Sequence, residues 1–225
     1  MNPALTPKQL AAYIDHTLLR ADATAEDIER LCAEAREYSF FAVCINSSWV
    51  RYACHLLEGS SIKIATVAGF PLGAMSCDAK RVETEIAVND GAQEIDVVLN
   101  IGRLKQHDKP YVLRELCEVV KAADKRTVKV ILETCLLTNE EKIRGCRLAV
   151  ESGAKFVKTS TGFNFGGAIV GDVALMRETV GSQFGVKAAG GIRNATTAFA
   201  MIEAGATRIG TSAGVAIVRE LARAC

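Results

Sequence analysis

Short apolar and β-branched runs alternate with longer segments of helical periodicity along the whole chain. Eight of the short runs have the length and composition of β-strands, and they cover residues 14–19, 41–46, 62–68, 94–100, 128–134, 155–161, 185–190 and 208–213. The intervening segments repeat apolar residues at the spacing of amphipathic helices, most clearly over 24–39, 77–92, 110–125, 138–154 and 195–206. Gly91, Gly153 and Gly205 fall where three of these helices are expected to end.

Strands that alternate with helices indicate repeated βαβ units, and such units build a parallel sheet. About eight repeats favour a sheet closed into a single eight-stranded parallel (β/α)8 barrel, an α/β fold of the TIM-barrel type. A doubly wound open sheet is the alternative, but no GxGxxG turn follows the first strand. The chain has 225 residues and no linker or low-complexity stretch, so residues 1–225 are expected to form one α/β-barrel domain.

Charge and cysteine usage exclude several classes of partner. The formal net charge is +1 without a block of like charges, so neither a nucleic acid nor a membrane is an expected partner. The eight cysteines include no CxxC pair and the three histidines are scattered, which predicts reduced thiols and no metal site. A signal peptide and apolar runs of roughly 18 residues are absent from the sequence. We therefore expect a soluble cytoplasmic protein with small-molecule ligands.

The alternation of side chains along the predicted strands places charged residues inside the barrel. In residues 94–100, Ile95, Val97 and Leu99 share the face that packs on helices, which leaves Asp96 inward. The same test directs further side chains inward, namely Asp15, Cys44, Lys158 and Lys187, with Lys129 and Glu133 as additional candidates. An internal ion-pair network is one interpretation of this set. The other is catalysis, because carboxyl-end residues of barrel strands supply the chemistry of barrel enzymes.

Two inward lysines on neighbouring strands are suited to amine chemistry. Lys158 falls on the sixth predicted strand and Lys187 on the seventh. A lysine with an ordinary pKa near 10.4 is neutral in only about one molecule in 2,500 at pH 7, and only the neutral amine attacks a carbonyl. A second ammonium group and partial desolvation favour that neutral form. Asp96 is then a candidate for proton transfer, or a carboxylate that only neutralises a lysine.

Two glycine-rich turns, AAGGIRN at 188–194 and RIGTSAG at 208–214, each lead into a helical pattern. Backbone N–H groups and helix amino termini in such turns can bind a phosphate, and barrel enzymes often carry a phosphate site after strands seven and eight. Alternatively, the glycines only terminate strands. The candidate substrate-binding and phosphate-binding residues are Thr161, Gly162, Gly190, Gly191, Gly210, Thr211, Ser212, Asp15 and Cys44.

Six stretches in combination resemble the deoxyribose-phosphate aldolase family, class I aldolases that form a Schiff base on an eight-stranded barrel. They are KTSTGF (158–163), EIDVVLNIG (94–102), VKAAGGIR (186–193), GFPLGA (69–74), IDHTLL (14–19) and RIGTSAGV (208–215). The resemblance covers nearly the whole chain. It implies that Lys158 forms the Schiff base, that Lys187 perturbs the amine and takes part in proton transfer, and that Asp96 is the third catalytic residue.

The activity implied by the resemblance is reversible cleavage of 2-deoxy-D-ribose 5-phosphate into D-glyceraldehyde 3-phosphate and acetaldehyde, without metal or organic cofactor. The sequence does not determine the oligomeric state, and a homo-oligomer is compatible with it. A barrel isomerase acting on a sugar phosphate, or a non-catalytic sugar-phosphate-binding barrel, would share the glycine turns. The isomerase has no need of two inward lysines, and borohydride trapping of an imine distinguishes an aldolase from it. Turnover in a coupled glyceraldehyde-phosphate assay would exclude the binding barrel.

Overall fold

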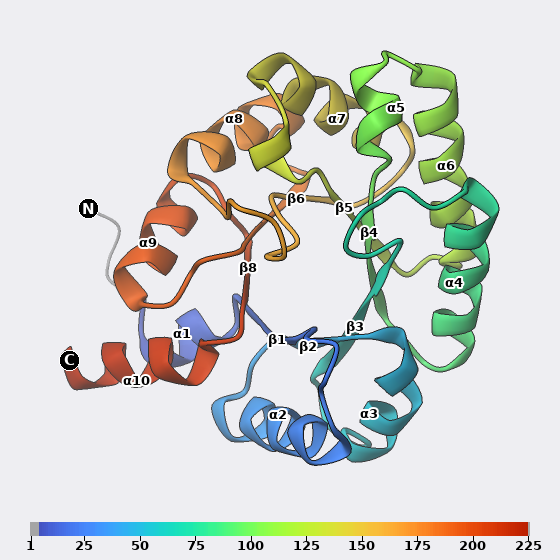
Figure 1. Cartoon of the computed structure of the whole chain (residues 1–225). Helices are drawn as coiled ribbons and strands as arrows, with labels where there is room; N and C mark the ends of the chain where they lie inside the picture. The colour runs from blue at the N-terminus through green and yellow to red at the C-terminus, as the bar shows by residue number, and fades with distance from the viewer. Residues whose placement is uncertain (1–4, 225) are drawn as a thin grey trace.

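Eight parallel strands close into a barrel, and the helices surround it (Figure 1). The computed structural model describes residues 5–224. Each strand pairs with the next and β8 pairs with β1, which confirms the predicted barrel and excludes the open sheet. The strands are β1 (Ile14–Leu18), β2 (Ala42–Ile45), β3 (Lys63–Ala68), β4 (Glu94–Val98), β5 (Thr127–Ile131), β6 (Phe156–Lys158), β7 (Gly185–Ala189) and β8 (Arg208–Thr211).

The helices lie outside the sheet, in the connections between successive strands and at both ends of the described chain (Figure 1). The α-helices are α1 (Pro7–Ala11), α2 (Ala25–Tyr38), α3 (Val50–Leu56), α4 (Cys77–Asn89), α5 (Ile101–Lys105), α6 (Lys109–Ala122), α7 (Asn139–Glu151), α8 (Val170–Val180), α9 (Ala195–Glu203) and α10 (Gly214–Ala224). Two short 3-10 helices, η1 (Ser47–Trp49) and η2 (Thr134–Leu136), follow β2 and β5.

The five helices predicted from periodicity are all present, and capping residues set their ends. Thr24 and Thr138 each begin a helix with a capping box, in which side chain and backbone satisfy each other's hydrogen bonds. Helices α4, α7 and α9 end two residues before Gly91, Gly153 and Gly205, whose φ angles are 109°, 86° and 108°. Glycine adopts this left-handed conformation without the steric cost of a Cβ atom.

Several strands end earlier than the apolar runs predict. β5 ends at Ile131 and β6 at Lys158, so the predicted strand residues 132–133 and 159–161 lie in loops, and residue 134 begins η2. A side chain adds to the backbone hydrogen bonds there, since the backbone N–H of Thr161 donates to Glu133 Oε1 at 3.2 Å. Glu133 itself has a φ of 56°, which turns the chain out of the sheet. These residues therefore contribute to the carboxyl-end loops that form the site.

The main hydrophobic core lies between the sheet and the helices. Ile95, Val97 and Leu99 are fully buried in it, as the parity of β4 predicts. A smaller apolar cluster of inward residues consists of Leu19, Cys44, Ala65 and Val67. None of the helices in residues 5–224 is long and apolar enough to cross a membrane.

Candidate active site

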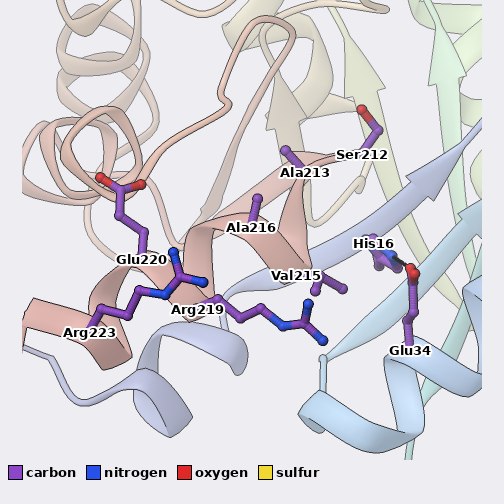
Figure 2. A pocket seen from close by; sticks show the side chains of 9 residues that line it. All are labelled: His16, Glu34, Ser212, Ala213, Val215, Ala216, Arg219, Glu220 and Arg223. Carbon is purple, nitrogen blue, oxygen red and sulfur yellow. Dashed lines mark hydrogen bonds and ion pairs between the residues drawn. The ribbon is translucent and has the colours of Figure 1, made fainter.

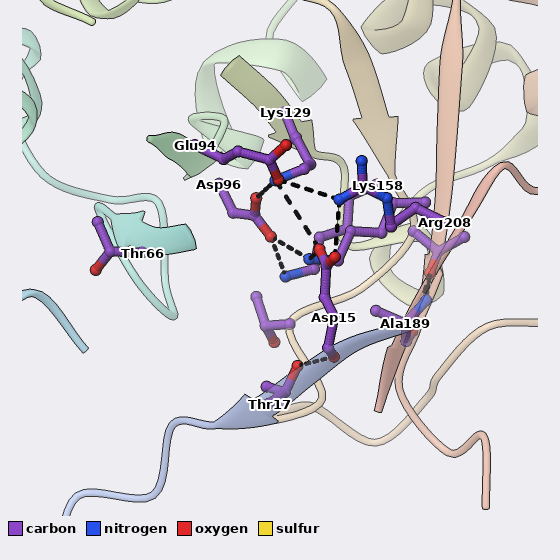
Figure 3. Close-up of polar contacts among 12 residues, drawn as sticks. Asp15, Thr17, Thr66, Glu94, Asp96, Lys129, Lys158, Ala189 and Arg208 are labelled. Atoms are coloured by element: carbon purple, nitrogen blue, oxygen red, sulfur yellow. Dashed lines mark hydrogen bonds and ion pairs between the residues drawn. The ribbon is translucent and has the colours of Figure 1, made fainter. Parts of the chain in front are cut away.

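Charged side chains from six of the eight strands meet in the middle of the barrel (Figure 3). All are buried, and they are Asp15, Glu94, Asp96, Lys129, Lys158, Lys187 and Arg208. Three carboxylates face four basic groups, so the cluster carries one positive charge in excess when every group is ionised. A buried excess charge is costly, and loss of a proton from one amine would relieve it.

Asp96 is the centre of this cluster. Lys158 Nζ and Lys187 Nζ both donate to Asp96 Oδ2, at 2.9 and 2.8 Å. Lys129 Nζ donates to the other oxygen, Oδ1, at 2.8 Å. The parallel register of β6 and β7 places Lys158 directly beside Lys187. The two lysines therefore share one carboxylate oxygen and compete for its negative charge.

Burial and charge act in opposite directions on the pKa values of these groups. Burial alone would raise the pKa of Asp96, but the ammonium groups of Lys129, Lys158 and Lys187 outweigh it and hold that pKa well below its ordinary value. Burial would lower the pKa of Lys187, yet the carboxylates of Asp15 and Asp96 outweigh burial and raise it. Asp96 is therefore an anion and Lys187 a cation at neutral pH.

The rest of the cluster holds these groups in place. Lys129 Nζ lies 2.6 Å from Glu94 Oε2, and Arg208 bridges Glu94 at 3.2 Å and Asp15 Oδ1 at 2.8 Å. Lys187 also donates to Asp15. Asp15, Glu94, Lys129 and Arg208 each have a charged partner within hydrogen-bond distance. For these residues the structure shows the ion pairs that one interpretation of the sequence predicts. Asp15 thereby pairs with Lys187, and Lys129 pairs with Asp96.

A cavity of about 310 Å³ opens above the cluster, between the loops that follow β1, β6, β7 and β8. Lys158 lines this cavity and is itself 2 % exposed, so its amine lies between the charged interior and the ligand space. The predicted ligand-binding residues Thr161, Gly162, Gly190, Gly191, Gly210, Thr211 and Ser212 line the same cavity. The structure thus brings together residues from three separate sequence stretches.

Glycine occupies three positions at the cavity for different structural reasons. Gly190 has a φ of 92°, and a Cβ atom there would lie 3.0 Å from Gly167 Cα, so the two loops could not approach as closely. Gly191 has a φ of 78° with open space around it. A Cβ atom on Gly210 would lie 2.9 Å from Lys187 Cε, so Gly210 leaves room for the Lys187 stem.

Asp15 and Cys44 lie deeper than the sequence suggested. Both are fully buried, and the residues that line the cavity do not include them. Asp15 pairs with Lys187 and Arg208, while Cys44 packs in the small inward apolar cluster, where burial raises the pKa of its thiol. Direct contact of either residue with a ligand stays a prediction.

Three charged or aromatic positions on the cavity wall were not predicted. Arg20, Phe163 and Arg193 line the cavity from the loops after β1, β6 and β7. Phe163 packs edge-on against Phe70 with ring centroids 5.2 Å apart, which brings the segment after β3 next to the mouth of the cavity. The position of each residue just beyond a strand's carboxyl end was the available signal.

A second, larger hollow of about 640 Å³ lies outside the barrel along α10 (Figure 2). His16 lines it with its Nε2 atom 2.7 Å from Glu34 Oε2, which agrees with the outward parity of His16 in β1. This hollow shares Ser212 with the inner cavity. Its lining includes none of the inward lysines, so the amine chemistry belongs to the inner cavity.

We expect Asp96→Asn to reduce the free energy of unfolding by about 3–5 kcal/mol, because it leaves buried ammonium groups without their shared counter-charge. Urea denaturation followed by circular dichroism measures this difference. Asp78→Asn is the matched control, since the Asp78 side chain is 90 % exposed and should change stability by less than about 0.5 kcal/mol. A loss at Asp96 no larger than at Asp78 would contradict the central role of its charge.

The fold and the cavity define an α/β-barrel enzyme whose site presents an amine beside a buried carboxylate. The chain belongs to the DeoC/LacD family of aldolases, whose family model matches residues 9–221.

Four similar proteins are described as deoxyribose-phosphate aldolases. The deoxyribose-phosphate aldolase of Brevibacillus brevis is 58% identical over 92% of this chain and 93% of its own length. That of Streptococcus uberis is 56% identical over 92% of this chain and 94% of its own. A crystal structure of a deoxyribose-phosphate aldolase, described as putative, from Coccidioides immitis aligns with a TM-score of 0.94 and 42% identity, covering 97% and 87% of the two chains. The tetrameric deoxyribose phosphate aldolase of Aeropyrum pernix aligns with a TM-score of 0.91 and 34% identity, covering 98% and 94%.

Proposed function

We propose that this chain is a class I aldolase that reversibly cleaves 2-deoxy-D-ribose 5-phosphate into D-glyceraldehyde 3-phosphate and acetaldehyde. Its relatives at 55–58% identity are named deoxyribose-phosphate aldolase, which supports the substrate. One observation carries the mechanism: Lys158 is the member of the buried charge cluster that lines the cavity. An amine at that position can meet a substrate carbonyl without leaving its carboxylate partner.

Lys158 acts as the nucleophile in this proposal. The neutral amine adds to the substrate aldehyde, and loss of water gives a protonated imine. The imine withdraws electrons from the bond between the second and third carbons of the sugar, which breaks as the hydroxyl group on the third carbon loses its proton. D-glyceraldehyde 3-phosphate leaves, and the remaining enamine takes up a proton and is hydrolysed to acetaldehyde. No external oxidant or reductant is required, because the electrons of the broken bond stay in the enamine.

Lys187 and Asp96 control charge and protons around the imine. Of the amines in the cluster, that of Lys158 is the one beside the ligand space. Lys187, which is a cation paired with Asp15 and Asp96, supplies the neighbouring positive charge. Asp96 Oδ2 lies within hydrogen-bond distance of both amines and can relay a proton between them or through a water molecule.

The substrate phosphate binds at the turns after β7 and β8 in this proposal. Both turns precede helices, α9 and α10, and line the cavity that Lys158 reaches. Backbone N–H groups and a helix amino terminus attract a phosphate without a cluster of basic side chains. The reacting aldehyde and the phosphate of one substrate molecule would thus occupy the two ends of a single cavity.

Borohydride reduction in the presence of 2-deoxy-D-ribose 5-phosphate tests the proposed function directly. An imine is reduced to a stable secondary amine, so mass spectrometry of a protein digest should locate the adduct on Lys158. Coupled measurement of glyceraldehyde 3-phosphate should show turnover in the same preparation. Release of glyceraldehyde 3-phosphate without any trapped adduct would overturn the imine mechanism. Absence of both would support the isomerase or the binding protein, and conversion of the sugar phosphate to an isomer separates these two.

We expect Gly191→Val to weaken binding of the phosphorylated sugar more than binding of unphosphorylated 2-deoxyribose. A valine at φ 78° strains the turn and places methyl groups in the open space beside it. The parent protein should use the unphosphorylated sugar poorly, and the variant should lose about tenfold in kcat/KM for the phosphorylated sugar alone. Equal kcat/KM values of the parent for the two sugars would count against a phosphate site in this turn.

Assembly, location and domain organisation complete the proposal. We propose a homo-oligomer, supported by the tetrameric relative from Aeropyrum pernix, and light scattering after size-exclusion chromatography tests it. We propose a cytoplasmic location because the cysteines in the described part of the chain are all unpaired. Residues 1–225 are proposed to form one catalytic domain, which the closure of all eight strands into one barrel supports.

A further inference from the structure

Arg20 is a basic side chain on the cavity wall that the roles above leave unused. It follows β1, and the same cavity is lined by Thr211 and Ser212 after β8. The barrel closes by pairing β1 with β8, where His16 lies beside Thr211. The chain that continues from β1 to Arg20 therefore runs next to the turn that begins α10.

Two aspartates hold the Arg20 guanidinium. Its Nη1 atom lies 2.8 Å from Asp22 Oδ1 and donates to the Asp22 carbonyl at 3.0 Å, while Nη2 donates to Asp27. Asp27 is itself fixed at the start of α2, where it accepts the backbone N–H of Thr24 at 3.0 Å. The hydrogen bonds from Thr24, with those of Arg30 and the charge of Arg20, lower the pKa of Asp27 to about 2. Asp27 is thus charged at neutral pH and anchors the Arg20 guanidinium.

The two anchors differ in how strongly they bind. The Asp27 side chain is 12 % exposed, whereas that of Asp22 is 82 % exposed. An ion pair with a fully hydrated partner contributes little, so Asp22 is easily replaced by another anion. Guanidinium carries five N–H donors, which lets Arg20 keep Asp27 and bind a second anion at the same time.

A phosphate on the ligand needs charge as well as hydrogen bonds. A phosphate monoester carries about −1.5 to −2 charge at pH 7, and backbone N–H groups supply dipoles but no net charge. Lys158 cannot neutralise this charge, because its amine is required at the carbonyl. Of the two guanidinium groups that line the cavity, on Arg20 and Arg193, the described ion pairs fix that of Arg20.

We propose that Arg20 binds the substrate phosphate and determines the preference for phosphorylated sugars, exchanging Asp22 for a phosphate oxygen while Asp27 keeps the guanidinium in place. The inference rests on the proposed function. Arg20 is a specificity residue in this scheme and takes no part in breaking the carbon–carbon bond. Its loss should therefore act on substrate binding and leave the chemical step intact.

The test compares Arg20→Met with Arg30→Met on 2-deoxy-D-ribose 5-phosphate and on 2-deoxyribose. Arg30 is a matched control because it pairs with the same Asp27, is 64 % exposed and lies outside the set that lines the cavity. Arg20→Met should raise KM for the phosphorylated sugar at least about tenfold, with kcat and the kcat/KM for 2-deoxyribose within about twofold of the parent. Arg30→Met should leave the kinetics of both sugars unchanged. Arg20→Lys, which keeps the charge but loses the planar fork, should fall between parent and Arg20→Met.

Three results would overturn the assignment. One is a KM of Arg20→Met for the phosphorylated sugar within about twofold of the parent. Another is an equal loss on both sugars, which would indicate a structural role. The third is an equal effect of Arg30→Met, which would assign the change to Asp27 and α2. A parent protein that cleaves neither sugar would overturn the proposed function and this inference with it, so the two failures are distinguishable.

Discussion

Lys158→Arg is expected to reduce cleavage of 2-deoxy-D-ribose 5-phosphate to background, a loss of at least about a thousandfold. The substituted side chain keeps a positive charge, so Asp96 retains a partner at the position where Lys158 Nζ now donates at 2.9 Å. A guanidinium group is not neutral at any pH at which the protein is folded, and it cannot add to an aldehyde. Loss of activity would therefore follow from loss of the amine and not from loss of the charge.

Two measurements check this result. A coupled assay for glyceraldehyde 3-phosphate gives the turnover, and borohydride trapping with mass spectrometry gives the modified residue. Lys155→Arg is the matched control, because Lys155 is an exposed lysine three residues earlier and should retain both activity and adduct. Residual turnover of a few per cent in Lys158→Arg, or an adduct mapped to another lysine, would refute the assignment of the nucleophile.

Lys187→Met is expected to slow imine formation at pH 7 by about two to four orders of magnitude and to shift its pH profile toward alkaline values. Lys187 and Lys158 now share Asp96 Oδ2, and removal of Lys187 leaves that oxygen to Lys158 alone. Both the lost repulsion and the stronger pairing favour the ammonium form of Lys158. We therefore expect less free amine and slower imine formation in Lys187→Met at pH 7, with partial recovery of the rate toward about pH 9 or 10.

Single-turnover imine formation over a pH series, with parent and variant side by side, measures this effect. The fold should persist, because Asp15 keeps Arg208 at 2.8 Å and Asp96 keeps Lys129 at 2.8 Å. Lys129→Met is the matched control, since Lys129 is equally buried but binds the other oxygen of Asp96, and it should give a smaller alkaline shift. An unshifted and equally fast profile in Lys187→Met would show that Lys187 does not tune the amine. Slow turnover at every pH with normal imine trapping would instead make Lys187 an obligatory proton donor.

Strand and helix positions could be predicted because each depends on a short-range pattern. The inward direction of Asp96 follows from the apolar residues on either side of it in β4, and the ends of three helices follow from glycines that take a left-handed conformation. The strand ends beyond Lys158 and Ile131 were predicted too late. Beyond these ends the chain turns at Glu133, whose side chain accepts hydrogen bonds from Thr161, a contact between residues 28 positions apart.

The partners inside the barrel could not be predicted in the same way. Parity indicated that Asp15 faces inward, but its partners Lys187 and Arg208 are 172 and 193 positions away in the chain. The height of a side chain in the barrel depends on the register of every strand pair, and the sequence of one strand does not contain that register. For this reason Asp15 and Cys44 were grouped with the ligand-binding residues, although both lie below the cavity wall.

The sequence by itself determined the barrel, the inward faces of its strands, the lysine pair and the glycine turns, because local periodicity and turn chemistry act within a few residues. Tertiary structure alone decided that Lys158 and Lys187 share one oxygen of Asp96, that Lys158 reaches the cavity, and that Arg20 stands on its wall. Closure of the sheet through β1 and β8 is the physical reason. It brings the first and last strands of the chain side by side. Side chains that no local pattern relates thereby come within hydrogen-bond distance of each other.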